Sequence, residues 1–197
     1  MQRPGLPGPK REEKVKESIK ITSVLTFVCV ICAFLLAYIS GVASKKIEEN
    51  AEKKIQDSIH TLAPLTQAIK EIETKDTGII YKLFDKQDKL IGYAFIAQGQ
   101  GYQGTIKMLT VINPGLTLLE GIEVVESVET PGLGAKIQND FFRKQFKNLN
   151  VTQDIECVKE APTKDNQIEA ITGATVSSRA VVSILNKRIE AIRELVD

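Results

Sequence analysis

The chain has 197 residues, of which 43% are hydrophobic and 26% charged, and its formal net charge is +1. This near-neutral balance gives no electrostatic basis for binding nucleic acid. The single histidine, His60, precedes the main domain expected below, which excludes a Ser-His-Asp triad and a histidine-based metal site from that domain. Cys157 has no cysteine partner there, so no disulfide can form within it.

An uncharged, mostly apolar run covers residues 21–43. As a helix it would be about 34 Å long, enough to cross a hydrocarbon core of about 30 Å. The alternative is a cleaved signal peptide ending at the Gly41-Val42-Ala43 site, but the apolar core of a signal peptide has only about 7–15 residues. We therefore expect a retained transmembrane helix. Cys29 and Cys32 fall in its middle, where we interpret them as small apolar residues and not as a redox or metal pair.

Positive charge is more frequent before this run than after it, which predicts an N-terminus inside the cell and the rest of the chain outside the cytoplasmic membrane. The residues concerned are Arg3, Lys10, Arg11, Lys14, Lys16 and Lys20 before it, and Lys45, Lys46, Lys53 and Lys54 after it. We expect four segments: a loose cytoplasmic tail over 1–20, the transmembrane helix over 21–43, a helical stalk over 44–76 and one compact domain over 77–197.

Within the domain, apolar and β-branched runs predict four strands over 78–84, 89–97, 105–112 and 118–128. The residues 85–88 suit a hairpin turn, and Asn113-Pro114-Gly115 is a turn signature. A short apolar run over 168–171 is typical of another strand. The fold class is therefore α+β, with an antiparallel-leaning sheet and helices packed against it.

Two helices are expected to pack on this sheet. The first is short, over 140–146, with aromatic residues at 141, 142 and 146. The second ends the chain and carries apolar residues spaced by three or four, which predicts one buried face. These residues are Val181, Leu185, Ile189, Ile192 and Val196.

Three glycine-bearing loops are the candidate functional segments: 99–104, 129–134 and 172–178. Glycine allows a ligand to approach the backbone closely, and Tyr102 in the first loop could stack on an aromatic ring. In the second loop, Pro131 fixes one dihedral angle while its glycines free others. Taken alone, each of these two loops is more often a turn than a binding site.

The third loop, Thr172-Gly173-Ala174-Thr175-Val176-Ser177-Ser178, follows the apolar run and opens the final helix. Free N–H groups and the helix dipole at such a start can bind a phosphate, and Thr175 offers an alcohol beside it that could be esterified. Thr and Ser are also ordinary N-cap residues. The segment resembles the TGAT flavinylation motif, in which the second threonine carries FMN through a phosphoester bond.

Together, ETPGLG at 129–134, TGATxSS at 172–178, the GYxG loop and the apolar anchor resemble the G subunit of the Rnf electron-transport complex, an ion-translocating ferredoxin:NAD oxidoreductase. The resemblance covers the anchor and about residues 77–197. It implies that Thr175 is the covalent FMN attachment residue. It also implies that Thr172, Gly173, Ala174 and Ser177 complete the segment recognised by a flavin transferase. It implies further that Glu129, Thr130, Gly132 and Leu133 line the flavin, with Tyr102 near it.

Two positions depart from the family's usual pattern. Glu169 stands where members often carry an aspartate, which keeps the charge, and Ser127 stands where a histidine is common, which questions a proton-donor role there. The function implied is an electron relay between other membrane subunits of the complex, without catalytic residues or a metal of its own. The alternatives are a flavoprotein resembling the C subunit of the sodium-translocating NADH:quinone oxidoreductase or serving another extracytoplasmic chain, and a membrane-anchored assembly subunit without flavin.

Overall fold

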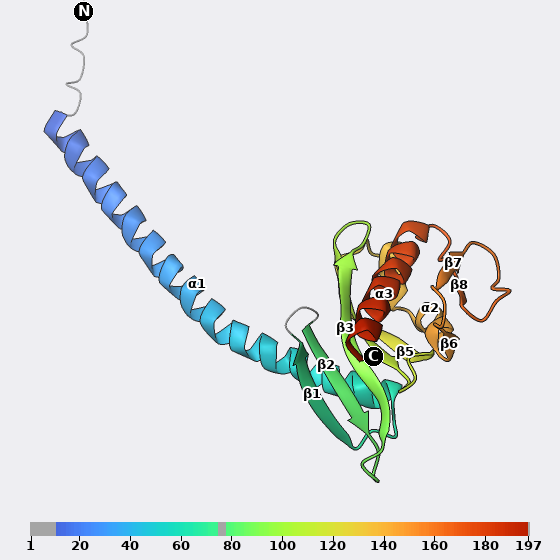
Figure 1. Cartoon of the computed structure of the whole chain (residues 1–197). Coiled ribbons are helices and arrows are strands. Elements are labelled where there is room, and N and C mark those ends of the chain that lie inside the picture. Colours follow the sequence, from blue (N-terminus) through green and yellow to red (C-terminus); the bar gives the residue numbers. More distant parts are fainter. Residues whose placement is uncertain (1–10, 75–77, 197) are drawn as a thin grey trace, which may run out of the picture. The chain divides into compact units, whose positions relative to one another are not determined.

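The computed structural model describes residues 11–74 and 78–196, so residues 1–10 of the expected tail lie outside the described part. The chain divides into two compact units, Met1–Ala51 and Glu52–Asp197. Figure 1 labels the helices and strands.

Helix α1 (Arg11–Leu62) contains the apolar run. Its segment Val15–Gly41 is long and apolar enough to cross a membrane, judged by length and composition. The helix begins at Arg11, whereas a loose tail was expected up to residue 20. The sequence around 11–18 explains this difference, because Glu and Lys are good helix formers and Glu12 precedes Lys16 by four residues.

Helix α1 ends two residues before Pro64, and strand β1 (Ala68–Thr74) follows. The stalk was expected to be helical over 44–76, but its described residues are helical only to Leu62, and residues 75 and 76 lie outside the described part. Proline cannot continue a helix and disfavours helical backbone in the residue before it. Ile69 and Ile72 are spaced by three, which suits a helix and puts the two on opposite faces of a strand. Pairing of β1 with β2 determines the outcome, with Ile69 packed against the core and Ile72 exposed.

A six-stranded antiparallel sheet forms the centre of the second unit, with strands in sequence order from β1 to β6. Its other members are β2 (Gly78–Phe84), β3 (Leu90–Gln100), β4 (Thr105–Ile112), β5 (Leu118–Ser127) and β6 (Leu149–Asn150). The four predicted strands are thus confirmed, with β3 extended at its end. The Asp85 carboxylate closes the first turn by accepting the Gln87 and Lys89 N–H groups at 2.8 and 3.0 Å.

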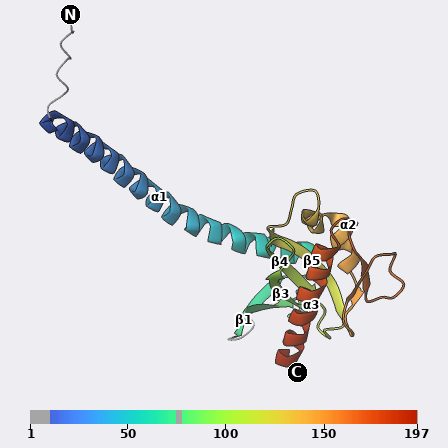
Figure 2. The same ribbon diagram turned by 90° about the horizontal axis from the view of Figure 1, so that it is seen from above.

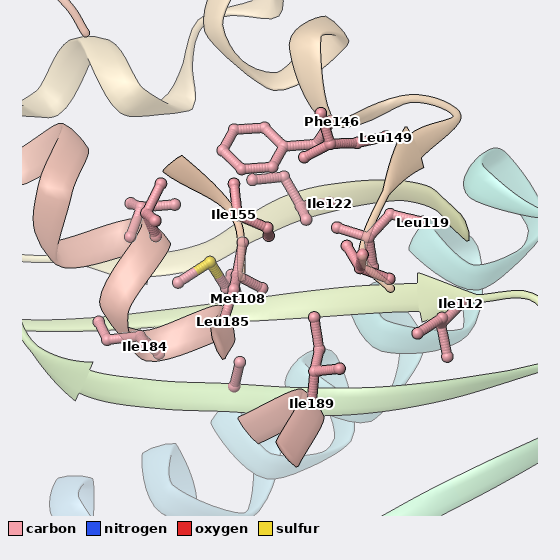
Figure 3. Close-up of a cluster of buried hydrophobic side chains, with 14 of the residues drawn as sticks. Met108, Ile112, Leu119, Ile122, Phe146, Leu149, Ile155, Ile184, Leu185 and Ile189 are labelled. Atoms are coloured by element: carbon pink, nitrogen blue, oxygen red, sulfur yellow. The ribbon is translucent and has the colours of Figure 1, made fainter. Parts of the chain in front are cut away.

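Each face of the sheet is covered by a helix (Figures 1 and 2). Helix α3 (Thr175–Val196) covers the face that carries Phe95 and Met108, while the last turns of α1 cover the face that carries Leu109. Successive residues of a strand point to opposite faces, which is why Met108 and Leu109 belong to different clusters. Figure 3 shows the first cluster between α3 and the sheet.

The apolar stripe of α3 is buried as predicted at Val181, Leu185, Ile189 and Ile192, and the side chain of Val196 is outside the described set. Ile59 on the last turns of α1 is also fully buried, in the cluster on the other face. The compact unit therefore begins in α1, at Glu52.

The segment between β5 and α3 contains short elements. These are η1 (Gly134–Gln138), α2 (Asp140–Arg143), η2 (Lys144–Phe146), and the parallel pair β7 (Glu156–Val158) and β8 (Gln167–Glu169). Phe142 and Phe146 are buried and in edge-to-face contact, with 5.4 Å between ring centroids, but Phe141 is exposed. The expected short helix thus packs on the core through two of its three aromatic residues.

Candidate functional site

The three glycine-bearing loops meet at the end of the sheet where α3 begins. A cavity of about 440 Å³ lies between the loop after β3, the loop after β5 and the start of α3. Its lining consists of Tyr102, Glu129, Thr130, Leu133, Gly134, Gly173, Ala174, Thr175, Val176 and Ser177. This volume falls in the range of small-molecule and cofactor sites.

Most of the residues expected at the site line this cavity, with two exceptions. Thr172 lines a neighbouring cavity, and Gly132 is not among the lining residues. Gly132 has a φ of +77°, so its role is in the backbone turn of the loop. Gly134 and Val176 line the cavity although sequence reasoning did not single them out; both lie inside the two motifs.

The start of α3 presents free backbone donors beside the cavity. The first hydrogen bond of the helix runs from the Ser178 N–H to the Ala174 carbonyl at 3.0 Å, so the N–H groups of the preceding three residues have no partner within the helix. The buried Ser178 hydroxyl accepts the Ile171 N–H at 3.0 Å and thereby joins the segment after β8 to the first turn of α3. Gly173, at a φ of +82°, makes the turn between them.

Glu129 connects all three loops. Its Oε1 accepts the Tyr102 N–H at 2.7 Å and the Gln103 N–H at 3.1 Å, and its Oε2 accepts the Ser177 hydroxyl at 2.6 Å. The residue is only 5% exposed, and burial by itself raises the pKa of its carboxyl group. The hydrogen bonds from Ser177 and from the backbone of Gln103, Tyr102 and Gly104 outweigh burial and hold that pKa below its usual value.

Two glycines pack directly against this carboxylate. A Cβ at Gly101 would collide with Oε1 of Glu129, and a Cβ at Gly134 would collide with Oε2 and lie 2.6 Å from the Ser177 hydroxyl. Any side chain at either position would displace the carboxylate. These glycines are therefore required for close approach and not for an unusual φ.

The opening of the cavity is apolar. Tyr102 is 70% exposed, Val176 57% and Leu133 50%, and all three line the cavity. Large apolar side chains so exposed around a concave site suit a planar aromatic ligand that covers them. Thr175 is half-buried in the same lining, beside the free N–H groups of α3.

A neighbouring cavity of about 560 Å³ is larger but lacks Thr175. Thr172 and Glu169 line it together with Gln145, whose side-chain amide holds the backbone of Glu169 through bonds of 2.6 and 3.3 Å. Ser127, at the other departing position, accepts the Glu129 N–H at 3.3 Å and so supports the backbone before the loop. The smaller cavity is the one that places an esterifiable alcohol, that of Thr175, beside the free N–H groups of α3.

Comparisons with known proteins identify the family. A family model described as FMN-binding domain matches residues 101–190, which include the second and third loops and residues 101–104 of the first. The chain is 30% identical over 184 residues to the G subunit of the ion-translocating oxidoreductase complex of Methanosarcina acetivorans, covering 90% of this chain and 95% of that protein. The chain belongs to this G-subunit family.

Another member is the G subunit of the proton-translocating ferredoxin:NAD(+) oxidoreductase complex of Clostridium ljungdahlii, 29% identical over 92% of this chain and 95% of its own. The fold of this chain is shared with the crystal structure of the C subunit of the Na(+)-translocating NADH-quinone reductase from Parabacteroides distasonis. That match has a TM-score of 0.55 and 16% identity, and it covers 68% of this chain and 79% of the other.

Proposed function

We propose that this chain is the electron-carrying flavoprotein subunit of a membrane-bound, ion-translocating ferredoxin:NAD oxidoreductase complex, with FMN bound covalently to Thr175. The observation that carries the proposal is the cavity in which Thr175 lies between the two glycine loops, beside the free N–H groups of α3. Family membership and the FMN-binding domain match support it.

The residues present fit FMN on both chemical counts. The N–H groups of Thr175, Val176 and Ser177 offer donors and a positive dipole end to a phosphate. Tyr102 and Leu133 offer apolar surface to the flavin ring. When bound, the flavin supplies the redox chemistry, and the protein positions it and sets its electrostatic surroundings.

Attachment requires a separate flavin transferase. Thr175 Oγ would form a bond to the phosphorus of the FMN half of FAD and displace AMP, while its hydroxyl proton passes to a base of the transferase. Among the described residues, the cavity lining holds no histidine or lysine that could act as that base, which suits a chain that is the substrate of this reaction. Thr172 and Gly173 are exposed next to Thr175 and would be readable by the transferase in the folded domain.

The expected partners are the other membrane subunits of the complex. The candidate span Val15–Gly41 supports a membrane anchor, and the bias of positive charge supports an N-terminus in the cytoplasm with the flavin domain outside. Covalent attachment has an evident value there, because lost FMN could not readily be replaced. We expect little activity from the isolated chain, since its role is to relay electrons.

The decisive experiment is peptide mass spectrometry of the chain produced together with a flavin transferase. The peptide containing Thr175 should gain the mass of one FMN less water, and Thr175→Val should abolish the gain. Thr163→Val, which removes a threonine hydroxyl away from the cavity, is the matched control and should keep the gain. An unmodified wild-type peptide beside a proven active transferase would leave the assembly-subunit alternative.

A further inference from the structure

The Glu129 carboxylate is a buried charge in the cavity lining that attachment at Thr175 does not use. It lies between residues far apart in the sequence, because Tyr102 and Ser177 are 27 and 48 residues from it. Three hydrogen bonds of 2.6–3.1 Å reach its two oxygens, and two glycines enclose them. The carboxylate is therefore held in one position before any ligand binds.

We propose that Glu129 is a positioning residue that joins the three loops and places a fixed negative charge in the cavity lining, where it lowers the reduction potential of the bound flavin. This inference rests on the proposed function. Reduction adds negative charge to a flavin, and a fixed negative charge nearby makes that addition less favourable. Burial strengthens this effect, because charge is screened less around a side chain that is only 5% exposed.

Ser177 modulates this charge. Its hydroxyl donates to Oε2 and so directs the positive end of a dipole at the carboxylate, which offsets part of the negative field. Ser177 is only 2% exposed, so its side chain is not available on the surface of the folded domain. Its place in the TGATxSS segment is thus explained by its bond to Glu129 and not by direct reading by a transferase.

The two residues predict shifts of opposite sign. Glu129→Gln keeps the size of the side chain and an oxygen acceptor for the N–H groups, but removes the charge, and it should raise the flavin midpoint potential. Ser177→Ala leaves the carboxylate with less compensation, and it should lower the potential when measured at pH 8, where the carboxylate is ionised. A purely structural loosening would move both variants in the same direction.

The test uses the full chain in detergent, loaded by its transferase, with flavin content per chain measured before each reductive titration. Glu126→Gln is the matched control, because Glu126 is an exposed glutamate three residues earlier, and its potential should equal that of the wild type. Wild-type potential in a loaded Glu129→Gln variant, or shifts of one sign in both variants, would overturn the inference. Loss of flavin from Glu129→Gln alone would overturn it too, because the charge would then serve flavin loading and not the potential. Absence of flavin from the wild-type chain would instead refute the proposed function, and the inference with it.

Discussion

Replacing Gly134 by alanine tests whether the Glu129 carboxylate is held as tightly as the structure shows. The new Cβ would collide with Oε2 and lie 2.6 Å from the Ser177 hydroxyl. Both neighbours are buried, so the carboxylate must move and lose the hydrogen bond from Ser177. A hydrogen bond to a charged group contributes about 1.5–3 kcal/mol.

Overpacking by the new Cβ costs about 1–3 kcal/mol, but displacing the carboxylate relieves part of this cost. The overpacking cost and the cost of the lost hydrogen bond therefore do not add fully. We expect Gly134→Ala to lower the free energy of unfolding by about 2–3 kcal/mol and the melting temperature by roughly 5–10 °C. The assay is urea unfolding of the flavin-free chain in detergent, with the folded fraction read by brief proteolysis.

Gly115→Ala is the matched control for this measurement. The nearest atom to a Cβ at Gly115 is the Thr117 hydroxyl at 3.8 Å, an ordinary contact, so the expected change is within about 0.5 kcal/mol. If Gly134→Ala were as stable as Gly115→Ala, the Glu129 carboxylate would not be held tightly in this position, and its charge would not be fixed beside the cavity.

Three further predictions concern the stability of the same domain. Thr110 is buried, and within the described residues its hydroxyl has no hydrogen-bond partner, so Thr110→Val should raise the free energy of unfolding by about 1 kcal/mol; a loss in urea unfolding would reveal a partner. Ile59→Ala should lower the free energy of unfolding by about 2–4 kcal/mol in the same assay, whereas Leu65→Ala, at an exposed position, should change it little. Equal effects of the two variants would show that α1 does not pack into the core. The folded-state pKa of Glu129 lies below its unfolded value of 4.5, so its stabilisation is present above that pH and is lost as pH falls through the folded pKa. Glu129→Gln should therefore flatten the acid side of the stability profile, and unchanged slopes would contradict this.

Local sequence patterns predicted most of the sheet and of α3, because alternation and spacing reflect burial directly. They failed for β1, whose Ile69 and Ile72 have the spacing of a helix but whose strand conformation comes from pairing with β2. They also failed for Phe141, which was expected to pack on the sheet but is exposed. A short helix has too few residues for its apolar spacing to indicate which face is buried. Side chains that bond to distant backbone, such as Asn186 to both polar groups of Ile155, leave no local signal.

The candidate site was predictable as a set of motifs but not as an arrangement. The resemblance of the motifs assigned the loops of Tyr102, Glu129 and Thr175 to one site, and in the structure all three line one cavity. Which motif residues face the cavity could not be read from the sequence. Ser177 is in the lining yet almost fully buried, and Thr172, just before the turn at Gly173, lines another cavity.

The last turns of α1 determine where a soluble form of this domain can begin. Cutting the chain at residue 77, the start expected from the sequence, would remove Ile59 together with β1. The face of the sheet that carries Leu83, Leu109 and Val111 would then meet water. Strand β2 would become an unprotected edge that can pair with another copy and seed aggregation. A form that begins before Glu52 would retain both the cover and the natural edge strand.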